Sequence, residues 1–202
     1  MNTPKQASPH HAIQPLIAER WSPYAFSERA VSEDDLRSLF EAARWAASSY
    51  NEQPWRYIVA VKSNAAEFAR LLSCLVDGNQ VWAKAAPVLA VGCVSKNLAM
   101  TGKPNDAAEH DLGLASGTLT FEGTARGLSV HQMIGILPDK VRELYRVPDD
   151  YRPLTGLAIG YAADPSVLPE NIRGRDLAKR TRRPLSEFVF GGQWGKASDV
   201  VK

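Results

Sequence analysis

Cysteine is scarce in this sequence, and neither sign of charge dominates. Cys74 and Cys93 are the two cysteines and form no CxxC pair, so we predict two free thiols in a reducing compartment. The 24 basic and 22 acidic residues leave a net charge of +2. Because proteins that bind nucleic acid usually carry a marked positive balance, we expect no nucleic acid among the partners.

Long apolar stretches are also missing. No run of apolar residues reaches the length of about 20 that spans a bilayer, so a membrane is not an expected partner. Residues 1–11 are polar, contain Pro4 and Pro9, and lack the apolar core of a signal peptide, which favours a cytoplasmic protein. We expect them to form a flexible tail with little to bury, so its removal should leave the rest of the protein intact.

Common sequence signatures of enzyme sites are absent too. The sequence has no GxGxxG motif after a strand, no GxxxxGK[ST], no HExxH and no GxSxG. This argues against a Rossmann dinucleotide site, a P-loop, a zincin and an esterase-type serine. The histidines at positions 10, 11, 110 and 131 form no zinc-like cluster, so no metal site is expected.

What remains is the pattern of one globular domain. The 202 residues are 45% hydrophobic, which is enough to build one core. Ser32, with Asp35 three residues later, is typical of a helix start and predicts a helix to about Ala47. Further helices are predicted near residues 13–17, after Asn64, over 106–126 and from Pro138, and strands over 55–62, 87–94, 127–132 and 154–162. Alternating helices and strands indicate an α/β or α+β class.

Two of these segments have an unusual composition. The helix predicted over 106–126 contains small residues at 113 and 115–117, which let another backbone approach closely. From about residue 164 the sequence has little periodicity, yet it carries a final aromatic patch of Phe188, Phe190 and Trp194. A free tail gains nothing from such side chains, so we expect this C-terminal arm to pack on another surface.

Two arginine-containing clusters lie near opposite ends of the sequence. Ser22, which carries a hydroxyl, lies two residues after Arg20. The two side chains can bind a phosphate or form a solvated helix end. Arg180, Arg182 and Arg183 place three cations within four residues, which suits a phosphate monoester or a basic surface tail. Each cluster taken alone leaves both interpretations open.

A neutral polar loop lies between these clusters in the sequence. It runs from Ser48 to Trp55 (SSYNEQPW) and carries two hydroxyls and two amides, from Ser48, Ser49, Asn51 and Gln53. These groups suit a polyhydroxyl chain or the edge of a heteroaromatic ring, although a Ser- and Asn-rich turn has the same composition. Together with the cationic clusters, the loop indicates a ligand with a phosphate, a ribitol chain and a ring.

In order and spacing, these elements resemble the nitroreductase family. The resemblance spans roughly residues 12–194 and rests on Arg20-x-Ser22, Ser48-Ser49-x-Asn51-x-Gln53-Pro54-Trp55, His131-Gln132-Met133 and Arg180-x-Arg182-Arg183-Pro184-Leu185. It implies an α+β fold with a central, mostly antiparallel sheet surrounded by helices, in one domain over residues 12–202. It also implies an intertwined homodimer with one FMN per interface. Such an enzyme reduces its FMN with NADH or NADPH and then reduces a nitroaromatic, quinone or related acceptor in a ping-pong cycle.

Carried over by position, the resemblance assigns residues to the flavin. Arg20, Trp21 and Ser22 would lie at the phosphate and ribityl end together with Arg180, Arg182 and Arg183. Ser48, Ser49, Asn51 and Gln53 would reach the flavin from the other subunit. Gln132 and Met133 would face the isoalloxazine edge, in part through backbone N–H groups. Family members often carry Lys or Arg where this sequence has Tyr24, which leaves one cation fewer near the flavin.

Several assignments stay open. His131 suits a donor to flavin or substrate and a structural role equally well; Trp55 is predicted to be core, and Trp82 in a loop over Asp77–Lys84 is a candidate for the substrate side. No catalytic side chain is assigned, because flavin carries the redox chemistry. A specialised flavin-fragmenting or dehalogenating member, a flavin-binding dimer without turnover and a phosphate-binding module are alternatives. Neither the acceptor nor the preference for NADH or NADPH can be read from the sequence.

Overall fold

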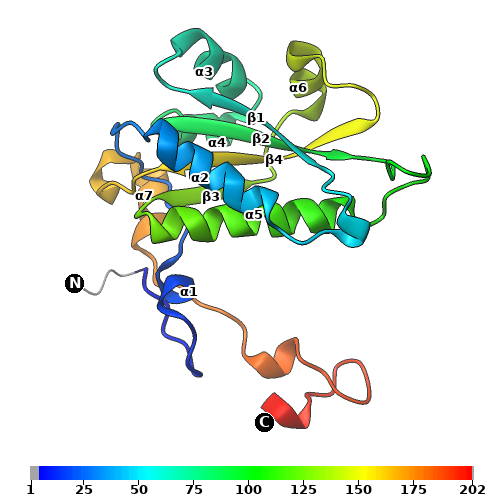
Figure 1. Ribbon diagram of the computed structural model, residues 1–202. Coiled ribbons are helices and arrows are strands. Elements are labelled where there is room, and N and C mark those ends of the chain that lie inside the picture. Colours follow the sequence, from blue (N-terminus) through cyan, green and yellow to red (C-terminus); the bar gives the residue numbers. More distant parts are fainter. Residues whose placement is uncertain (1–4, 202) are drawn as a thin grey trace.

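A four-stranded sheet forms the centre of the computed structural model, which describes residues 5–201 (Figure 1). Its strands are β1 (Trp55–Val61), β2 (Val88–Ser95), β3 (Ser129–Met133) and β4 (Tyr151–Gly160). They lie in the order β1-β2-β4-β3, and every neighbouring pair is antiparallel. The predicted α+β fold with an antiparallel sheet is therefore confirmed.

Helices cover both faces of this sheet. The helices α2 (Glu33–Arg44) and α5 (Ala108–Ala125) lie on one face, and α3 (Ala65–Leu72), α4 (Asp77–Ala83) and α6 (Pro138–Tyr145) on the other (Figure 1). Alternate residues of β2 enter two separate core clusters, one on each face of the sheet. Successive side chains of a strand point to opposite faces, which explains why β2 reads as a continuous apolar run.

Local capping sets the helix starts where the sequence predicted them. The Ser32 hydroxyl accepts the N–H of Asp35 at 3.0 Å, and the Asn64 side chain accepts the N–H of Glu67 at 3.2 Å. These bonds satisfy donors that the first turn of a helix leaves free. The predicted end of the first of these helices at Ala47 is wrong. The backbone leaves the helix at Trp45, where ψ is 5°.

The segment over Asp77–Lys84 is also not the predicted loop. It forms α4, and Trp82 is 2% exposed in the core cluster on the face of the sheet that α3, α4 and α6 cover. Its N-cap residue, Val76, makes no side-chain capping bond, and the sequence has no long apolar period here, so this short helix depends on tertiary packing rather than on local preference. Trp55, in contrast, is a core residue as predicted, with 8% of its surface exposed.

The C-terminal segment contains a helix that the sequence did not predict. This helix, α7 (Glu170–Leu177), buries only Ile172 and Asp176. One apolar residue cannot create a helical period, which explains why the segment reads as irregular. Beyond α7 the arm leaves the body of the molecule (orange to red in Figure 1). It contains the short turns η3 (Leu185–Glu187) and η4 (Asp199–Val201).

The aromatic residues of this arm are not buried within the chain. Phe190 and Trp194 pack on each other with ring centroids 5.1 Å apart. Phe188 nevertheless keeps 57% of its surface exposed, and Trp194 keeps 89%. Packing of the arm on another surface therefore stays a prediction, and the body of this same chain does not supply that surface.

The N-terminal segment makes specific contacts from Lys5 onward. The Lys5 side chain is buried, and its Nζ donates to the carbonyls of Arg175 at 2.7 Å and Ala178 at 2.5 Å. The N–H of Ala7 donates to the carbonyl of Ala18 at 2.9 Å. The expectation of a flexible tail over residues 1–11 does not fit these contacts; residues 1–4 lie outside the described residues. Across residues 5–201, no helix has both the length and the apolar character to cross a membrane.

Candidate functional site

Arginines from both ends of the sequence meet beside the short helix α1 (Pro15–Glu19). Arg20 follows this helix directly, and its Nη1 donates to the Ser22 hydroxyl at 3.3 Å. Arg180 comes from the far end of the chain, and its Nη1 donates to the carbonyls of Lys5 at 2.9 Å and Ala18 at 2.7 Å. The fold thus joins the two cationic clusters that the sequence places about 160 residues apart.

The electrostatics of this cluster are unfavourable without an anion. Burial lowers the pKa of Arg20, and the nearby charge of Arg182 lowers it further. The pKa of Arg180 is also lowered, first by burial and then by the charges of Arg20 and Arg182. Among residues 5–201, no ion pair is found between these three guanidiniums and a carboxylate. Two partly dehydrated cations, Arg20 and Arg180, with the exposed Arg182 beside them, fit a multiply charged anion such as a phosphate monoester.

Two further residues of the predicted clusters, Trp21 and Arg183, lie at the edge of the arginine cluster. The Arg183 side chain is 81% exposed and has its nearest carboxylate on Glu187 at 4.0 Å. Trp21 is half-buried, and the Lys5 ammonium lies 5.6 Å from the centre of its ring. Trp21 therefore helps to pack the N-terminal segment against the cluster, whereas Arg183 faces solvent.

The polar loop after α2 adopts a strained backbone. It contains the turn η1 (Ser49–Asn51), and Tyr50, Asn51 and Gln53 all have positive φ angles of 47–57°. Such angles cost on the order of 1 kcal/mol each in residues other than glycine. The N–H of Gln53 donates to the Ser48 hydroxyl at 3.1 Å, and the Gln53 amide donates to the carbonyl of Asn51 at 3.0 Å. These bonds hold the loop in one conformation.

A buried carboxylate anchors the same loop to α5. Asp111 is 1% exposed, and it accepts the N–H of Ser49 at 3.1 Å. The neighbouring residue Tyr50 is 91% exposed, and Asn51 is exposed as well. Because the base of the loop is fixed while its tip is open, the loop presents preorganised polar groups at the surface of the chain.

The polar loop and the arginine cluster do not meet within one chain. In Figure 1 the loop lies at one end of α5, whereas α1 and the segment that leads to Arg180 lie below the other half of that helix. The predicted site residues therefore fall into two groups separated along α5.

The β3 strand supplies the third predicted element, but its side chains are engaged elsewhere. The Gln132 amide donates to the carbonyl of Ser116 at 3.1 Å and to the hydroxyl of Thr120 at 2.9 Å. Met133 is buried in the core at 7% exposure. Since β3 is an edge strand, it has backbone groups that no neighbouring strand pairs. At these positions the backbone groups, rather than the two side chains, are available to contact a ligand.

An aromatic cluster stands beside this edge. Tyr24, Trp82 and His131 pack together, with ring centroids 4.4–5.1 Å apart. His131 Nδ1 lies 2.8 Å from the Pro23 carbonyl, so this nitrogen carries a proton and donates it to the carbonyl oxygen. Burial lowers the pKa of His131, and the Pro23 carbonyl and the charge of Asp176 partly oppose this effect. His131 therefore has a structural bond, while Nε2 is left as an acceptor in the neutral ring.

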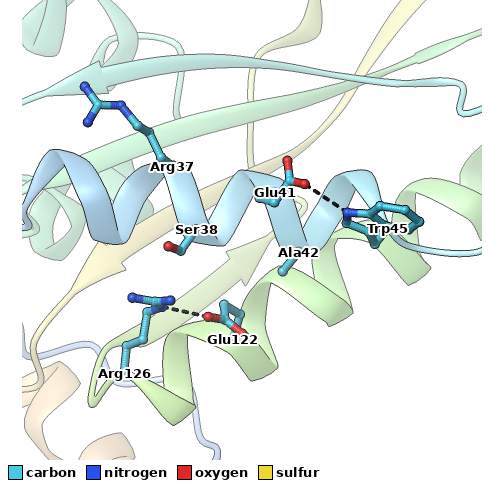
Figure 2. Close-up of a pocket in the computed structure, with 7 residues that line it drawn as sticks. All are labelled: Arg37, Ser38, Glu41, Ala42, Trp45, Glu122 and Arg126. Carbon is cyan, nitrogen blue, oxygen red and sulfur yellow. Dashed lines mark hydrogen bonds and ion pairs between the residues drawn. The ribbon is translucent and has the colours of Figure 1, made fainter.

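A surface hollow in the described part of the chain lies away from all of these residues. It has a volume of about 500 Å³ and is found between α2 and α5, with Arg37, Glu41, Trp45 and Arg126 on its walls (Figure 2). Figure 2 shows its polar groups bound to one another, Trp45 to Glu41 and Arg126 to Glu122. None of the predicted site residues lines it. We place the candidate site at the arginine cluster, because its guanidiniums have no carboxylate partner within residues 5–201.

Sequence reasoning missed three charged residues that organise the site: Lys5, Asp111 and Asp176. Each is nearly fully buried. Asp111 could have been suspected as a lone acid in a helix of small residues. Lys5 and Asp176 have their partners on the opposite end of the chain, and no local pattern reveals such contacts.

Comparison with known proteins agrees with this architecture. The model of the nitroreductase family matches residues 17–161. A solved oxidoreductase containing FMN is 32% identical with a TM-score of 0.88, and the match covers 96% of this chain and 98% of that one. A nitroreductase family protein of Clostridium difficile 630 is 25% identical with a TM-score of 0.69, covering 88% and 96% of the two chains. The FMN reductase (NAD(P)H) of Bacillus subtilis is 27% identical over 159 residues, which are 70% of this chain and 62% of the reductase. With a family match over most of its length and a fold shared with solved members, the chain belongs to the nitroreductase family.

Proposed function

We propose that this protein is a homodimeric, FMN-dependent oxidoreductase that takes electrons from NADH or NADPH and passes them to a small acceptor. The observation that carries the proposal is the convergence of Arg20, Arg180 and Arg182 without a carboxylate partner in residues 5–201. The family and the FMN-containing structural relative identify the phosphate monoester that suits this cluster. FMN carries one such phosphate at the end of its ribityl chain.

Within this proposal, the arginine cluster binds the phosphate end of FMN. The Arg20, Arg180 and Arg182 guanidiniums supply charge-assisted donors, and the Ser22 hydroxyl beside Arg20 supplies one more. Trp21 shields the cluster from one side. Arg183, which faces solvent, contributes through its charge at longer range.

The ring of the flavin is held by the polar loop of the partner subunit and by the edge of β3. Ser48, Ser49, Asn51 and Gln53 lie on the strained loop that points away from its own arginine cluster. Gln132 and Met133 offer backbone groups along the edge strand, and the half-buried His131 lies beside them. Donors at the ring edge favour reduced flavin, which carries negative charge near N1 and O2.

Dimerisation is supported by the exposed face of α5. This face carries Gly113, Leu114, Gly117, Thr118 and Phe121, and Leu114 and Phe121 are 40% and 36% exposed. The opposite face packs on α2 and the sheet. An apolar helix face is normally buried, so we infer that a second copy of the chain covers this face.

FMN, when bound, supplies the hydride and electron chemistry at its ring. The residues of the chain hold it, orient it and place hydrogen-bond donors at its edge; no nucleophile or acid–base triad is needed. Nicotinamide and acceptor would then use the bound cofactor in turn. We therefore propose a ping-pong cycle with nitroaromatics, quinones or related acceptors as the second substrate.

The test is the visible spectrum of the purified protein, followed by its rate of NADH and NADPH oxidation. We expect flavin absorbance, oxidation of at least one nicotinamide with a nitroaromatic or a quinone, and parallel lines in double-reciprocal plots. A yellow protein that oxidises neither nicotinamide would instead be a flavin-binding dimer without turnover. Progressive loss of flavin absorbance during turnover would indicate a flavin-fragmenting enzyme, and failure to bind FMN would reject the proposal.

A further inference from the structure

A buried carboxylate ties the two halves of the arginine cluster together. Asp176 lies on α7 and is 2% exposed. Both of its oxygens lie 3.0 Å from the N–H of Tyr24, and one also accepts the N–H of Ala25 at 2.9 Å. Asp176 thus bonds to the backbone four residues after Arg20, and it precedes Arg180 by four residues in the sequence.

Other contacts support the same docking of α7. The guanidinium of Arg175 lies 5.4 Å from the centre of the Tyr24 ring and donates to its hydroxyl at 3.3 Å. Lys5 Nζ binds the carbonyls of Arg175 and Ala178, close to the end of the same helix. Every one of these contacts joins the C-terminal segment to residues 5–25. The segment that carries Arg180 and Arg182 therefore has its position set by α7.

The carboxylate does not neutralise the arginines that it brings together. Its hydrogen bonds to Tyr24 and Ala25 are to backbone N–H groups, and its charge acts on Lys5 and His131. Leaving a dehydrated carboxylate in the protein is unfavourable unless it is well hydrogen-bonded. An apolar residue would pack α7 equally well, so the charge at this position is explained by the directed bonds that it makes.

We propose that Asp176 is a positioning residue for the anion site: its bonds to the backbone after Arg20 place Arg180 and Arg182 opposite Arg20. The proposal rests on the proposed function only for the identity of the anion as the FMN phosphate. Asp176 is buried and bonds to backbone N–H groups, so its effect is exerted through the arginines on affinity for the cofactor.

A double-mutant cycle on FMN affinity tests this role. We expect Asp176→Asn to weaken FMN binding about tenfold and Arg180→Ala to weaken it by about 10- to 100-fold. If Asp176 acts by placing the arginines, Asp176→Asn should have a smaller effect on FMN affinity when Arg180 is already replaced, and should change it less than threefold when Arg180 and Arg182 are both replaced by Ala. The rate of NAD(P)H oxidation at saturating FMN should stay within about twofold. Equal effects of Asp176→Asn in all three backgrounds would overturn the proposal.

Hydrogen exchange of the flavin-free protein supplies a readout that does not depend on activity. We expect Asp176→Asn to speed exchange at Tyr24, Ala25 and residues 178–183, and to leave the strands unchanged. Lys5→Met is a second variant that weakens the same docking without altering the buried carboxylate. Asp164→Asn is the matched control, because that exposed carboxylate lies on the same segment and caps only the N–H of Ser166 at 2.8 Å.

Failure of the proposed function gives a different result from failure of this inference. If the unmodified protein takes up no FMN, the cycle is repeated with inorganic phosphate as the titrant, and the same non-additivity is expected. Slower or unchanged exchange at Tyr24 and Ala25 in Asp176→Asn would refute the positioning role whatever the anion. General loss of protection across the sheet in both Asp176→Asn and Lys5→Met would show that the contacts serve stability alone.

Discussion

At the scale of single residues, the arginines of the candidate site are oriented by neutral oxygens. Arg180 is held by the carbonyls of Lys5 and Ala18, and Arg20 by the Ser22 hydroxyl. A carboxylate partner would have cancelled the charge needed for a phosphate. Neutral acceptors fix the geometry of a guanidinium and leave its positive charge available to the ligand.

Arg20→Ala should therefore weaken FMN binding by about one to two powers of ten, because a lost charge-assisted bond at a partly buried site costs roughly 1.5–3 kcal/mol. Titration of the flavin-free protein with FMN measures the change. Arg37→Ala is the control, since that exposed arginine pairs with Glu33 and Asp34 on α2. An unchanged FMN affinity in Arg20→Ala would remove this residue from the site.

His131 should make stability depend on pH. Burial lowers its pKa in the folded protein, so below about pH 6.5 the unfolded chain binds a proton that the folded chain does not. Stability is then fully present above about pH 6.5 and falls as the pH decreases from there towards the folded pKa. Melting temperatures of His131→Gln measured between about pH 5 and 7.5 should show a flatter profile. The matched control is His110→Asn, at an exposed ring; a profile unaltered by His131→Gln would contradict the assignment.

Single residues were predictable from the sequence only where neighbours reinforced them. Arg20 and Arg182 stood out because hydroxyls or further arginines surround them, and the fold does bring them together. Asp176 is one acid in an irregular segment, and its partner Tyr24 lies 152 positions away. A contact of that kind leaves no trace in local composition, so it became visible only in the folded chain.

At the scale of elements, α5 has the most unusual surface. Its exposed side combines glycines with Leu114 and Phe121, and a Cβ added at Gly113 or Gly117 would meet nothing within 4 Å in its own chain. Packing within the subunit therefore does not require glycine at either position. Close approach of a second backbone does require small residues there.

Gly117→Leu should leave the subunit folded but prevent dimerisation. A helical glycine is roughly 1 kcal/mol less favourable than alanine, so the replacement should not harm the helix itself. Its side chain would occupy the space that the partner needs. Sedimentation should show a monomer, and circular dichroism should show unchanged helix content. Ala69→Leu, at an exposed position of α3 on the other face of the sheet, is the control. A dimer that survives Gly117→Leu would place the interface elsewhere.

Elements with caps and a clear period were predicted well, and those shaped by tertiary contacts were not. Ser32 and Asn64 cap helices as expected, and β2 follows its apolar run. The helix α4 has no side-chain cap, and α7 buries only two residues. Short helices of this kind gain their stability from the surfaces on which they lie, and the sequence does not display those surfaces.

At the scale of the whole molecule, the predicted site residues come from both ends of the chain and, in the proposed dimer, from two subunits. The C-terminal arm contributes twice, because it carries the arginines and then the exposed aromatics around Trp194. The N-terminal segment contributes through Lys5, which contacts α7. Cofactor binding and assembly should therefore respond together when either end is removed.

Truncation after Pro169 should abolish FMN binding and cause dissociation or aggregation, because it removes α7, the arginines and the aromatic arm. Truncation after Pro184 keeps the arginines and should weaken the dimer more than it alters the phosphate site. Removal of residues 1–11, expected from the sequence to be harmless, should now lower FMN affinity through the loss of Lys5. Flavin content and solution mass are measured for each protein. A dimeric, yellow protein truncated after Pro169 would show that the arm is peripheral.

The meeting of Ala18 with Arg180, 162 positions later, also sets an order of events during synthesis. A ribosome adds roughly 5–20 residues per second, so the second half of the anion site follows the first by about 8–30 s. The strands and the helices around them precede α7 in the chain. A nascent chain halted before α7 would thus contain every strand of the sheet and still have nowhere to hold a phosphate, which makes cofactor loading one of the last steps in its maturation.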